Sequence, residues 1–391
     1  MKINEKEIRQ AENVVETVGT ISEYNISIRE CIRKCDIDGE DTNVHSAWIG
    51  GTVVVTSNGA EIKHSFTYLD TIRHTKKGDE NSKFKGILTA LGYDVAFNSD
   101  TKKLEYTKVD SPLIPKIPSK ITWVDENKNE VNSVTIQPNG EPTRVKVTTK
   151  LATNIGLNKD KSNLSFYDDL PIQYISRIKV ADEDSCRFVV EGVVKDIYLE
   201  PKGDGTTTDR YNVELVVPNF FNVDVFKLVM LNSWENVLED GITIQVTKDM
   251  FYDINNPDNS FCKIGDTVKL SGDIENHPVG IVKVNTTTRK SFGGGSQEIR
   301  SGYDRIERTI KAGDIVDGED KYDIELIKKA LEEREVFLDN EYNRLVEYQK
   351  SAPTQSKPNP SDTKPISNPF GGSTSSANAN PFGAKKKNPF G

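Results

Sequence analysis

The chain has 391 residues, of which 35% are hydrophobic and 28% charged, and its formal net charge is −9 at pH 7. This length exceeds a usual single core and predicts two folded domains with appendages. The negative total excludes a protein that coats nucleic acid with its whole surface, but it is compatible with a local basic groove. There is no run of 18 apolar residues, and the charged start lacks the apolar centre of a signal peptide. We therefore expect a cytoplasmic protein with no membrane partner.

The four cysteines and four histidines are too dispersed to predict a disulfide framework or a metal site. Cys31 and Cys35 could form half of a zinc site, but no second pair of ligands stands at a matching spacing. The acidic pair Asp168 and Asp169 could suggest a metal, yet such pairs more often lie in solvated loops. The sequence therefore predicts no metal and no cofactor.

Motifs for catalysis are missing from the sequence. It contains no GxxxxGK[ST] phosphate loop, no GxGxxG, no HExxH and no GxSxG nucleophile elbow. The glycine-rich run at 293–295 lacks the lysine and the strand context of a phosphate loop. We expect a protein that is not an enzyme, and a hydrolase or nuclease is a distant alternative.

Residues 1–110 have the pattern of an N-terminal β-rich domain, which could be a diverged OB-fold. Residues 1–18 predict a short helix. Alternating, β-branched segments then predict strands at 25–32, 47–56 and 61–70. Asn58 and Gly59 predict a type I′ turn between the last two strands, because both residues tolerate positive φ angles. The segment 84–93 carries apolar residues on one helical face and predicts a helix.

The Pro-rich segment 111–120 predicts an extended linker and a domain boundary. We expect a second β domain over 121–290 that contains an OB-fold at about 186–290. Its five strands are expected at 186–199, 211–218, 222–231, 242–246 and 265–274. With a short helix at 233–241 after the third strand, this is the element order of the OB-fold, a five-stranded Greek-key barrel. Gly192 interrupts the first strand, where a bulge or sharp bend would let the strand curve around the barrel.

Residues 291–322 predict a linker, because they begin with the run SFGGGS. A long acidic amphipathic helix is expected at 323–350, where Ile327, Leu331 and Leu338 recur at helical spacing. This helix could pack on the barrel, or it could self-associate as a short coiled coil. The expected fold class is mainly β with minor α: OB-fold-like Greek-key barrels, a C-terminal helix and a disordered tail.

The tail, residues 351–391, is rich in Ser, Pro, Asn, Gly and Lys and predicts disorder. It has five lysines against one aspartate and contains the sequence NPFG three times. Each phenylalanine would project from an Asn-Pro turn as an apolar anchor for a partner. The candidate partner-binding residues are Phe370, Phe382 and Phe390. Alternatives are a ligand of EH domains, which would indicate an endocytic adaptor, and a neutral duplicated linker.

Basic and aromatic residues occur together in two regions, as a groove for single-stranded nucleic acid requires. In the first region a polar basic loop follows a strand on which Phe66, Tyr68 and His64 share one face by alternation. The candidates there are Arg73, Lys76, Lys77, Lys83, Phe84, Lys85, Phe66 and Tyr68. The structural alternative is a solvated loop beside core aromatics. In the second region the candidates lie near the oligonucleotide-binding strands of an OB-fold. They are Lys195, Tyr198, Lys202, Arg210, Phe220 and Phe221.

Three segments carry a resemblance to a known class of proteins: TKKGDENSKFKG at 75–86, FYDDLPIQYISRIKV at 166–180, and the unit VEGVV…GDTVKLSGDI. They resemble the OB-fold single-stranded-DNA-binding proteins of tailed bacteriophages. The resemblance implies a phage-encoded protein of the host cytoplasm that protects single-stranded DNA in replication or recombination. It also implies a C-terminal tail that recruits replication or recombination proteins.

The tail departs from that pattern, because it is basic and ends in Gly391, whereas bacterial tails of this type are acidic and end in Pro-Phe. It could instead touch DNA directly. The alternative function is that of a structural or adaptor protein, a phage virion component or a scaffold, which uses the NPFG tail for protein contacts. Self-association is compatible with both functions.

Overall fold

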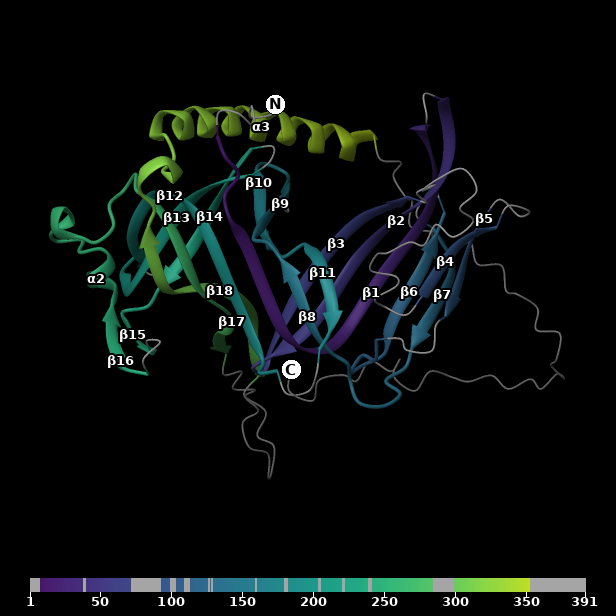
Figure 1. The fold of residues 1–391 in the computed structure, drawn as a ribbon, viewed down its shortest axis with the longest axis horizontal. Coiled ribbons are helices and arrows are strands. Elements are labelled where there is room, and N and C mark those ends of the chain that lie inside the picture. Colours follow the sequence, from purple (N-terminus) through teal and green to yellow (C-terminus); the bar gives the residue numbers. More distant parts are fainter. Residues whose placement is uncertain are drawn as a thin grey trace, which may run out of the picture. The chain divides into compact units, whose positions relative to one another are not determined.

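The computed structural model is mainly β, as predicted, with one long helix near the end of its described part (Figure 1). It describes residues 8–37, 40–71, 93–98, 103–108, 113–283 and 299–351, with short gaps at 126, 128, 159, 179–181, 203–204, 220–221 and 238–240. Residues 84–92 of the helix predicted at 84–93 and the tail beyond residue 351 lie outside these ranges, and Tyr93 is the first residue of a strand.

The first barrel is a ring of strands in the order β1-β2-β3-β11-β8. Its strands are β1 (Asn13–Ile37), β2 (Glu40–Ser57), β3 (Ala60–Thr71), β8 (Arg144–Thr149) and β11 (Ile172–Arg177). Antiparallel pairs join β1 to β2 and β8, β2 to β3, and β8 to β11. A parallel bridge between Ser65 and Pro171 closes the ring, and the Ser65 N–H donates a hydrogen bond to the Leu170 carbonyl at 3.2 Å. This is the connectivity of the OB-fold barrel.

The second barrel repeats this connectivity in the order β12-β13-β14-β18-β17. Its strands are β12 (Ser185–Pro201), β13 (Thr207–Pro218), β14 (Val223–Met230), β17 (Thr267–Lys283) and β18 (Ile299–Ile315). Antiparallel pairs join β12 to β13 and β17, β13 to β14, and β17 to β18. The parallel pair Val229 and Thr309 joins β14 to β18 and closes the ring. The OB-fold predicted in this part of the chain is therefore present.

Glycine lets the first strand of each barrel change partners. In β1, residues before Gly19 pair with β12 of the other barrel, and residues after it pair with β2. A Cβ on Gly19 would lie 2.2 Å from the Thr56 carbonyl oxygen. Gly192 occupies the same place in β12, where a Cβ would lie 2.5 Å from the Val216 carbonyl oxygen. At Gly192, where a bend was predicted, the backbone of β12 thus lies so close to that of β13 that a residue with a side chain would clash.

The two barrels are joined through their first strands. Asn13–Val18 of β1 pairs antiparallel with Ser185–Val190 of β12, so both barrels belong to one 12-stranded sheet. Two buried clusters fill the interiors. One includes Ile26, Val53 and Val147 of the first barrel, and the other extends from the second barrel to the long helix.

Within the described ranges, four hairpins and the α-helices α2 and α3 are added to the barrels. The hairpin strands are β4 (Tyr93–Asn98) and β5 (Lys103–Lys108), β6 (Ser119–Val124) and β7 (Glu130–Ile136), β9 (Ala152–Leu157) and β10 (Leu164–Asp169), and β15 (Ser233–Val237) and β16 (Thr243–Thr247). Strand β6 extends the sheet by pairing in parallel with β1. The helices are α2 (Lys248–Phe251) and α3 (Ile324–Ser351). Hairpin β15–β16 and α2 lie between β14 and β17 in the chain.

Helix α3 packs on the second barrel, as the first of the two alternatives for this helix predicts. It begins after Asp323, whose carboxylate accepts a hydrogen bond from the Glu325 N–H at 2.8 Å. Ile327 and Ala330 belong to the same buried cluster as the barrel interior. Across the described ranges, no helix is long and apolar enough to cross a membrane.

Two predicted helices are strands instead. Strand β1 begins at Asn13, inside the segment 1–18, because Asn13–Val18 pairs with Ser185–Val190 of β12. The segment 233–241 contains β15, whose residues pair with β16. The indole N–H of Trp234 also donates a hydrogen bond to the Lys311 carbonyl at 2.8 Å. In both places, pairing with distant strands overrides a helical spacing of apolar residues.

Both predicted linkers differ from the structure as well. The segment 111–120 includes the start of β6, and strands β8 and β11 of the first barrel follow it, so it lies within the path of that barrel. The segment 291–322 contains β18, the last strand of the second barrel. Polar residues occupy several of its buried positions, so the sequence lacks the usual alternation of apolar and polar residues. The segment 242–246 was expected to be a barrel strand, but it lies mostly in β16, outside the barrel ring.

His64 on β3 provides a test of the first barrel's interior. It is fully buried, and both ring nitrogens lack a hydrogen-bond partner among the described residues. Burial lowers its pKa to about 3. The unfolded chain binds this proton near pH 6.5, so stability should fall as pH drops from 6.5 towards 3, by about 2 kcal/mol at pH 5. Urea unfolding of His64→Leu should show greater stability than wild type at pH 8 and a smaller loss between pH 8 and pH 5. An equal loss in both proteins would contradict this assignment.

Candidate nucleic-acid interface

Each barrel has an outer face on its second and third strands, where OB-folds bind oligonucleotides. In the first barrel these strands are β2 and β3, and in the second they are β13 and β14. The two outer faces differ in what covers them and in their charge.

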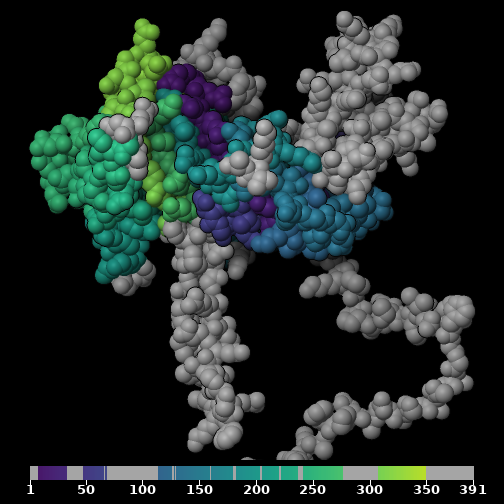
Figure 2. All heavy atoms as spheres, turned by 60° about the horizontal axis from the view of Figure 1, so that its bottom comes forward, coloured from purple at the N-terminus to yellow at the C-terminus, as the bar shows by residue number. Residues whose placement is uncertain are grey.

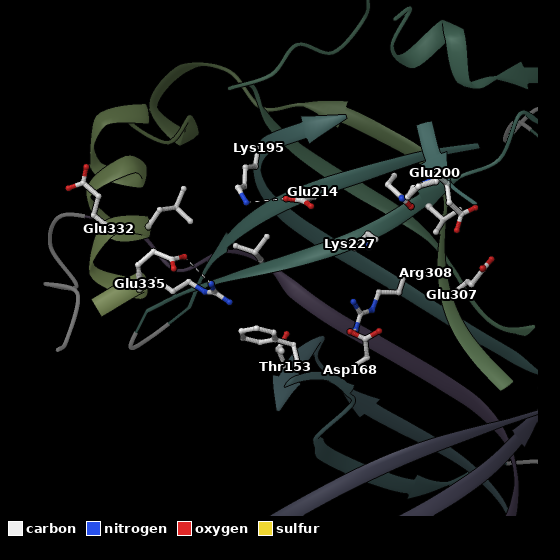
Figure 3. Close-up of a pocket in the computed structure, with 17 residues that line it drawn as sticks. Thr153, Asp168, Lys195, Glu200, Glu214, Lys227, Glu307, Arg308, Glu332 and Glu335 are labelled. Carbon is white, nitrogen blue, oxygen red and sulfur yellow. Dashed lines mark hydrogen bonds and ion pairs between the residues drawn. The ribbon is translucent and has the colours of Figure 1, made fainter. Parts of the chain in front are cut away.

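The outer face of the second barrel is a partly covered cleft of about 980 Å³ (Figure 3). Asn212 and Glu214 of β13 and Lys227 of β14 line it from the barrel side. Leu331 on helix α3 and Phe166 on hairpin β9–β10 line it from the opposite side. The helix and the hairpin therefore occupy the approach to this face.

This cleft contains more carboxylates than cations. Its cations are Lys195, Lys227, Arg308 and Arg334, and its carboxylates are Asp168, Glu200, Glu214, Glu307, Glu332 and Glu335. Several of them form ion pairs inside the cleft. The Lys195 ammonium lies 3.1 Å from Glu214, and the Arg210 guanidinium at the rim lies 2.7 Å from Glu307. A DNA phosphate placed here would meet uncompensated negative charge, so the cleft is poorly suited to a nucleic-acid backbone.

Two arginines hold hairpin β9–β10 over this cleft. Arg308 of β18 is buried, lies 2.8 Å from the Asp168 carboxylate, and has its guanidinium carbon 5.3 Å from the centre of the Phe226 ring. Burial lowers the pKa of Arg308, and the charge of Asp168 opposes that effect. From α3, the Arg334 guanidinium lies 5.8 Å from the centre of the Phe166 ring. Asp168 is thus engaged in a structural ion pair with Arg308.

Three predicted residues of the second region, Lys195, Tyr198 and Arg210, contact these carboxylates. Lys195 and Tyr198 share Glu214, to which the Tyr198 hydroxyl donates a hydrogen bond at 3.1 Å. Burial and the Glu214 carboxylate raise the pKa of Tyr198. Arg210 lies between Glu200 and Glu307, whereas Lys202 is exposed in the loop after β12. Their role in binding DNA stays a prediction. Phe220 and Phe221 lie outside the described residues.

Most predicted residues of the first region fall outside the described part of the chain. These are Arg73, Lys76, Lys77, Lys83, Phe84 and Lys85, and the tail residues Phe370, Phe382 and Phe390 are outside it too. Phe66 and Tyr68 lie in β3, where the register pairs them with Gly51 and Ile49, but their side chains are not described. The basic segment begins directly after Thr71, the last residue of β3.

The outer face of the first barrel presents a tryptophan that the sequence reasoning missed. Trp48 of β2 is 38% exposed, although its neighbours Ala47 and Ile49 are fully buried. The register pairs Trp48 with Arg29 of β1. Lys63 of β3 lies on the same outer face, six residues further along the strand pair, which corresponds to roughly 20 Å. The alternation of buried and polar positions in β2 is the sequence signal that could have placed Trp48 on the outside.

A second exposed ring lies on the strand beyond β3. Tyr174 of β11 is exposed, and β11 follows β3 in the order of the barrel, so Trp48 and Tyr174 lie on the two strands that flank β3. Within the described part of the chain, Arg29 and Lys63 form no ion pair with a carboxylate. This outer face therefore combines rings and cations without the internal neutralisation found in the cleft.

Comparisons with known proteins give one family and a distant likeness. A model of the family described as YorF matches residues 132–344, from β7 into α3 and through the whole second barrel. No curated protein matches the chain. Two solved structures of the single-stranded DNA binding protein from Thermus aquaticus match over much of their length. A deletion mutant matches with 10% identity and a TM-score of 0.26, covering 69% of this chain and 89% of that one. The wild type matches with 9% identity and a TM-score of 0.25, covering 68% and 87%. At these TM-scores the likeness assigns no function to this chain.

The Arg308–Asp168 pair can be tested by its effect on stability. Asp168→Asn should cost about 3 kcal/mol, because it leaves a buried guanidinium without its counter-charge. Arg308→Met should be close to neutral, since it removes the buried charge and keeps the packing on Phe226. The control Lys195→Met, in a half-exposed pair, should change stability by less than about 1 kcal/mol. Urea unfolding measures all three. Equal losses for Asp168→Asn and Lys195→Met would show that burial of Arg308 is not the determining feature.

Proposed function

The chain belongs to the YorF family, and we propose that this member is a non-enzymatic protein that binds single-stranded DNA. The observation that carries the proposal is the outer face of the first barrel. There, an exposed tryptophan, Trp48, lies on the second strand of an OB-fold barrel with Arg29 as its cross-strand neighbour, and Lys63 lies further along the same face; neither cation has a described carboxylate partner. Single strands are held by this combination, because bases stack on rings and phosphates pair with cations.

The basic segment after β3 supports the same surface. The register pairs Trp48 with Leu69, two residues before β3 ends at Thr71. The segment that follows contains Arg73, Lys76, Lys77, Lys83 and Lys85. Chain connectivity therefore starts this basic segment at the end of β3 where Trp48 lies. In this proposal its lysines hold phosphates while Trp48 stacks on a base.

The second barrel has a different part in this proposal. Its outer face is acidic and is lined by α3 and hairpin β9–β10. In this proposal the second barrel therefore has a structural role and does not bind phosphates. We further propose that the protein is phage-encoded, acts in DNA replication or recombination in the host cytoplasm, and recruits proteins of those processes through Phe370, Phe382 and Phe390. In the alternative function, the protein is a structural or adaptor protein that binds partners through the tail and does not bind DNA.

Replacement of Trp48 tests the stacking surface. Trp48→Ala should weaken binding of fluorescein-labelled oligo-dT by roughly 5- to 150-fold, because one base–ring stack contributes about 1–3 kcal/mol. The matched control is Phe261→Ala, which removes an exposed ring from the segment between β14 and β17, outside the strands of the first barrel. Fluorescence anisotropy at low salt measures both. Equal affinities of the two variants would remove Trp48 from the interface, and no binding by the wild type at low salt would favour the adaptor function.

Charge reversal in the basic segment tests the phosphate contacts. Lys76→Glu combined with Lys77→Glu should weaken oligo-dT binding and flatten its salt dependence, by about 0.7 in the log–log slope for each phosphate that the protein no longer neutralises. Lys195→Glu provides the control in the acidic cleft and should leave the slope unchanged. Titrations at several NaCl concentrations measure the slopes. A slope that is identical in wild type and the double variant would exclude this segment from the interface.

A further inference from the structure

The segment between β14 and β17, residues 232–266, exposes several large apolar side chains. It contributes to the green surface at the left of Figure 2. Met250, Phe261 and Ile264 are each more than half exposed, and Ile254 is exposed as well. These four residues are called the 250–264 patch below. Large apolar side chains gathered at one place on a soluble surface commonly mark a site of protein contact, and Met and Phe are enriched in such sites.

Buried neighbours fix the base of this patch. The Cys262 N–H donates a hydrogen bond to the Phe251 carbonyl at 3.0 Å, so Met250 and Phe261 adjoin the same bonded pair. The rings of Phe251 and Phe261 are 6.4 Å apart. Phe251 and Cys262 are buried in the core of the second barrel, whereas Met250 and Phe261 are directed to solvent. The patch is therefore held by the barrel and does not depend on a partner for its form.

The surroundings of the patch are negatively charged. Residues 232–266 contain seven acidic and two basic residues. One of the two cations, Lys248, is already engaged, because its ammonium lies 3.6 Å from Asp249 and 5.1 Å from the centre of the Tyr211 ring. The carboxylates of Asp253 and Asp258 lie within the loop that carries the patch. A ligand for this surface should therefore combine an apolar anchor with positive charge.

The C-terminal tail of the protein has that chemistry. Its last twelve residues, NPFGAKKKNPFG, place three lysines between two NPFG sequences. We propose that the 250–264 patch binds the NPFG segments of the protein's own tail, with phenylalanine against Met250 and Phe261 and lysines facing the surrounding carboxylates.

Length and repetition favour the tail as the occupant. Forty residues follow Ser351, and a chain of that length spans at most about 130 Å, which is ample to reach a surface of a domain of this size. Three NPFG segments raise the effective concentration of the anchor at one patch, so each contact can be weak and exchangeable. A tail bound in this way is withheld from outside partners until one of them competes for it.

A photo-crosslinking experiment on the full-length protein tests the proposal. Phe390 is replaced by p-benzoylphenylalanine, and crosslinked peptides are identified by mass spectrometry after irradiation. Crosslinks should concentrate within residues 249–264. Their yield should fall about fivefold or more in Phe261→Glu, because a carboxylate replaces the apolar contact and adds repulsion. The control Val131→Glu changes an apolar residue on β7 that is also more than half exposed, and it should leave the yield unchanged.

A second set of variants keeps the test decisive if Phe261→Glu perturbs folding, which circular dichroism would reveal. Met250→Glu alters the patch at a more exposed position. The triple variant Lys385→Glu, Lys386→Glu and Lys387→Glu leaves residues 8–351 untouched and should reduce the yield to the same extent. Crosslinks that fall outside 249–264, or that persist in both Met250→Glu and the lysine variant, would overturn the proposal.

Discussion

The antiparallel pairing of β1 with β12 is the interaction on which the rest of the architecture depends. It joins the first strands of two barrels with the same connectivity, and its register is symmetric about the pair Val15 and Phe188. Gly19 and Gly192 follow these two residues at equal distance and release each strand into its own barrel. Equivalent strands paired in this manner form an isologous contact, as in a two-fold dimer, although here both halves belong to one chain. Strands β1 and β12 must therefore be long, because the first part of each pairs with the other barrel and the later part pairs within its own barrel.

Although the barrels share a connectivity, additions to the chain make their outer faces unequal. In the second barrel, α3 and hairpin β9–β10 cover β13 and β14, and Arg308 and Arg334 fasten that hairpin through Asp168 and Phe166. The outer face of the first barrel keeps Trp48 exposed. The same fold therefore supports a packed structural face in one barrel and an accessible face in the other. This illustrates why a function must be assigned from a surface and not from a fold.

Local signals in the sequence predict the elements, while long-range pairing decides their roles. Asn58 and Gly59 have φ angles of 48° and 77°, so the hairpin predicted from this dipeptide is confirmed. The strand predicted at 186–199, which contains Gly192, is likewise confirmed as β12. Strands β8 and β11 were placed in the wrong unit, because the sequence offers no signal that a strand beyond a Pro-rich segment closes an earlier ring. Strand β18 was missed since its buried positions include Glu307 and Arg308, which are polar for reasons that only the covered cleft explains.

The same limit applies to the candidate site. Among the second-region candidates, Lys195 and Tyr198 share Glu214, which the register of β12 on β13 places beside them, and Arg210 pairs with Glu307 of β18, a strand that the sequence did not predict. Counting cations along the sequence cannot detect such neutralisation. Conversely, Trp48 lies between Ala47 and Ile49, and the burial of these two neighbours shows that its ring is on the outer face.

Charge decides how an acidic protein can hold a polyanion. At physiological salt the Debye length is about 8 Å, so a phosphate on the first barrel senses its nearest side chains more than the carboxylates of the second barrel. The net charge of −9 then provides no long-range attraction, and encounter with DNA gains nothing from steering. Affinity must therefore come from short-range contacts. Base stacking on rings such as Trp48 would contribute the part that is insensitive to salt, and contacts between a few lysines and phosphates would contribute the part that depends on salt. The proposed function therefore requires that the acidic cleft and the acidic 232–266 segment belong to the second barrel, while the proposed DNA-binding face belongs to the first.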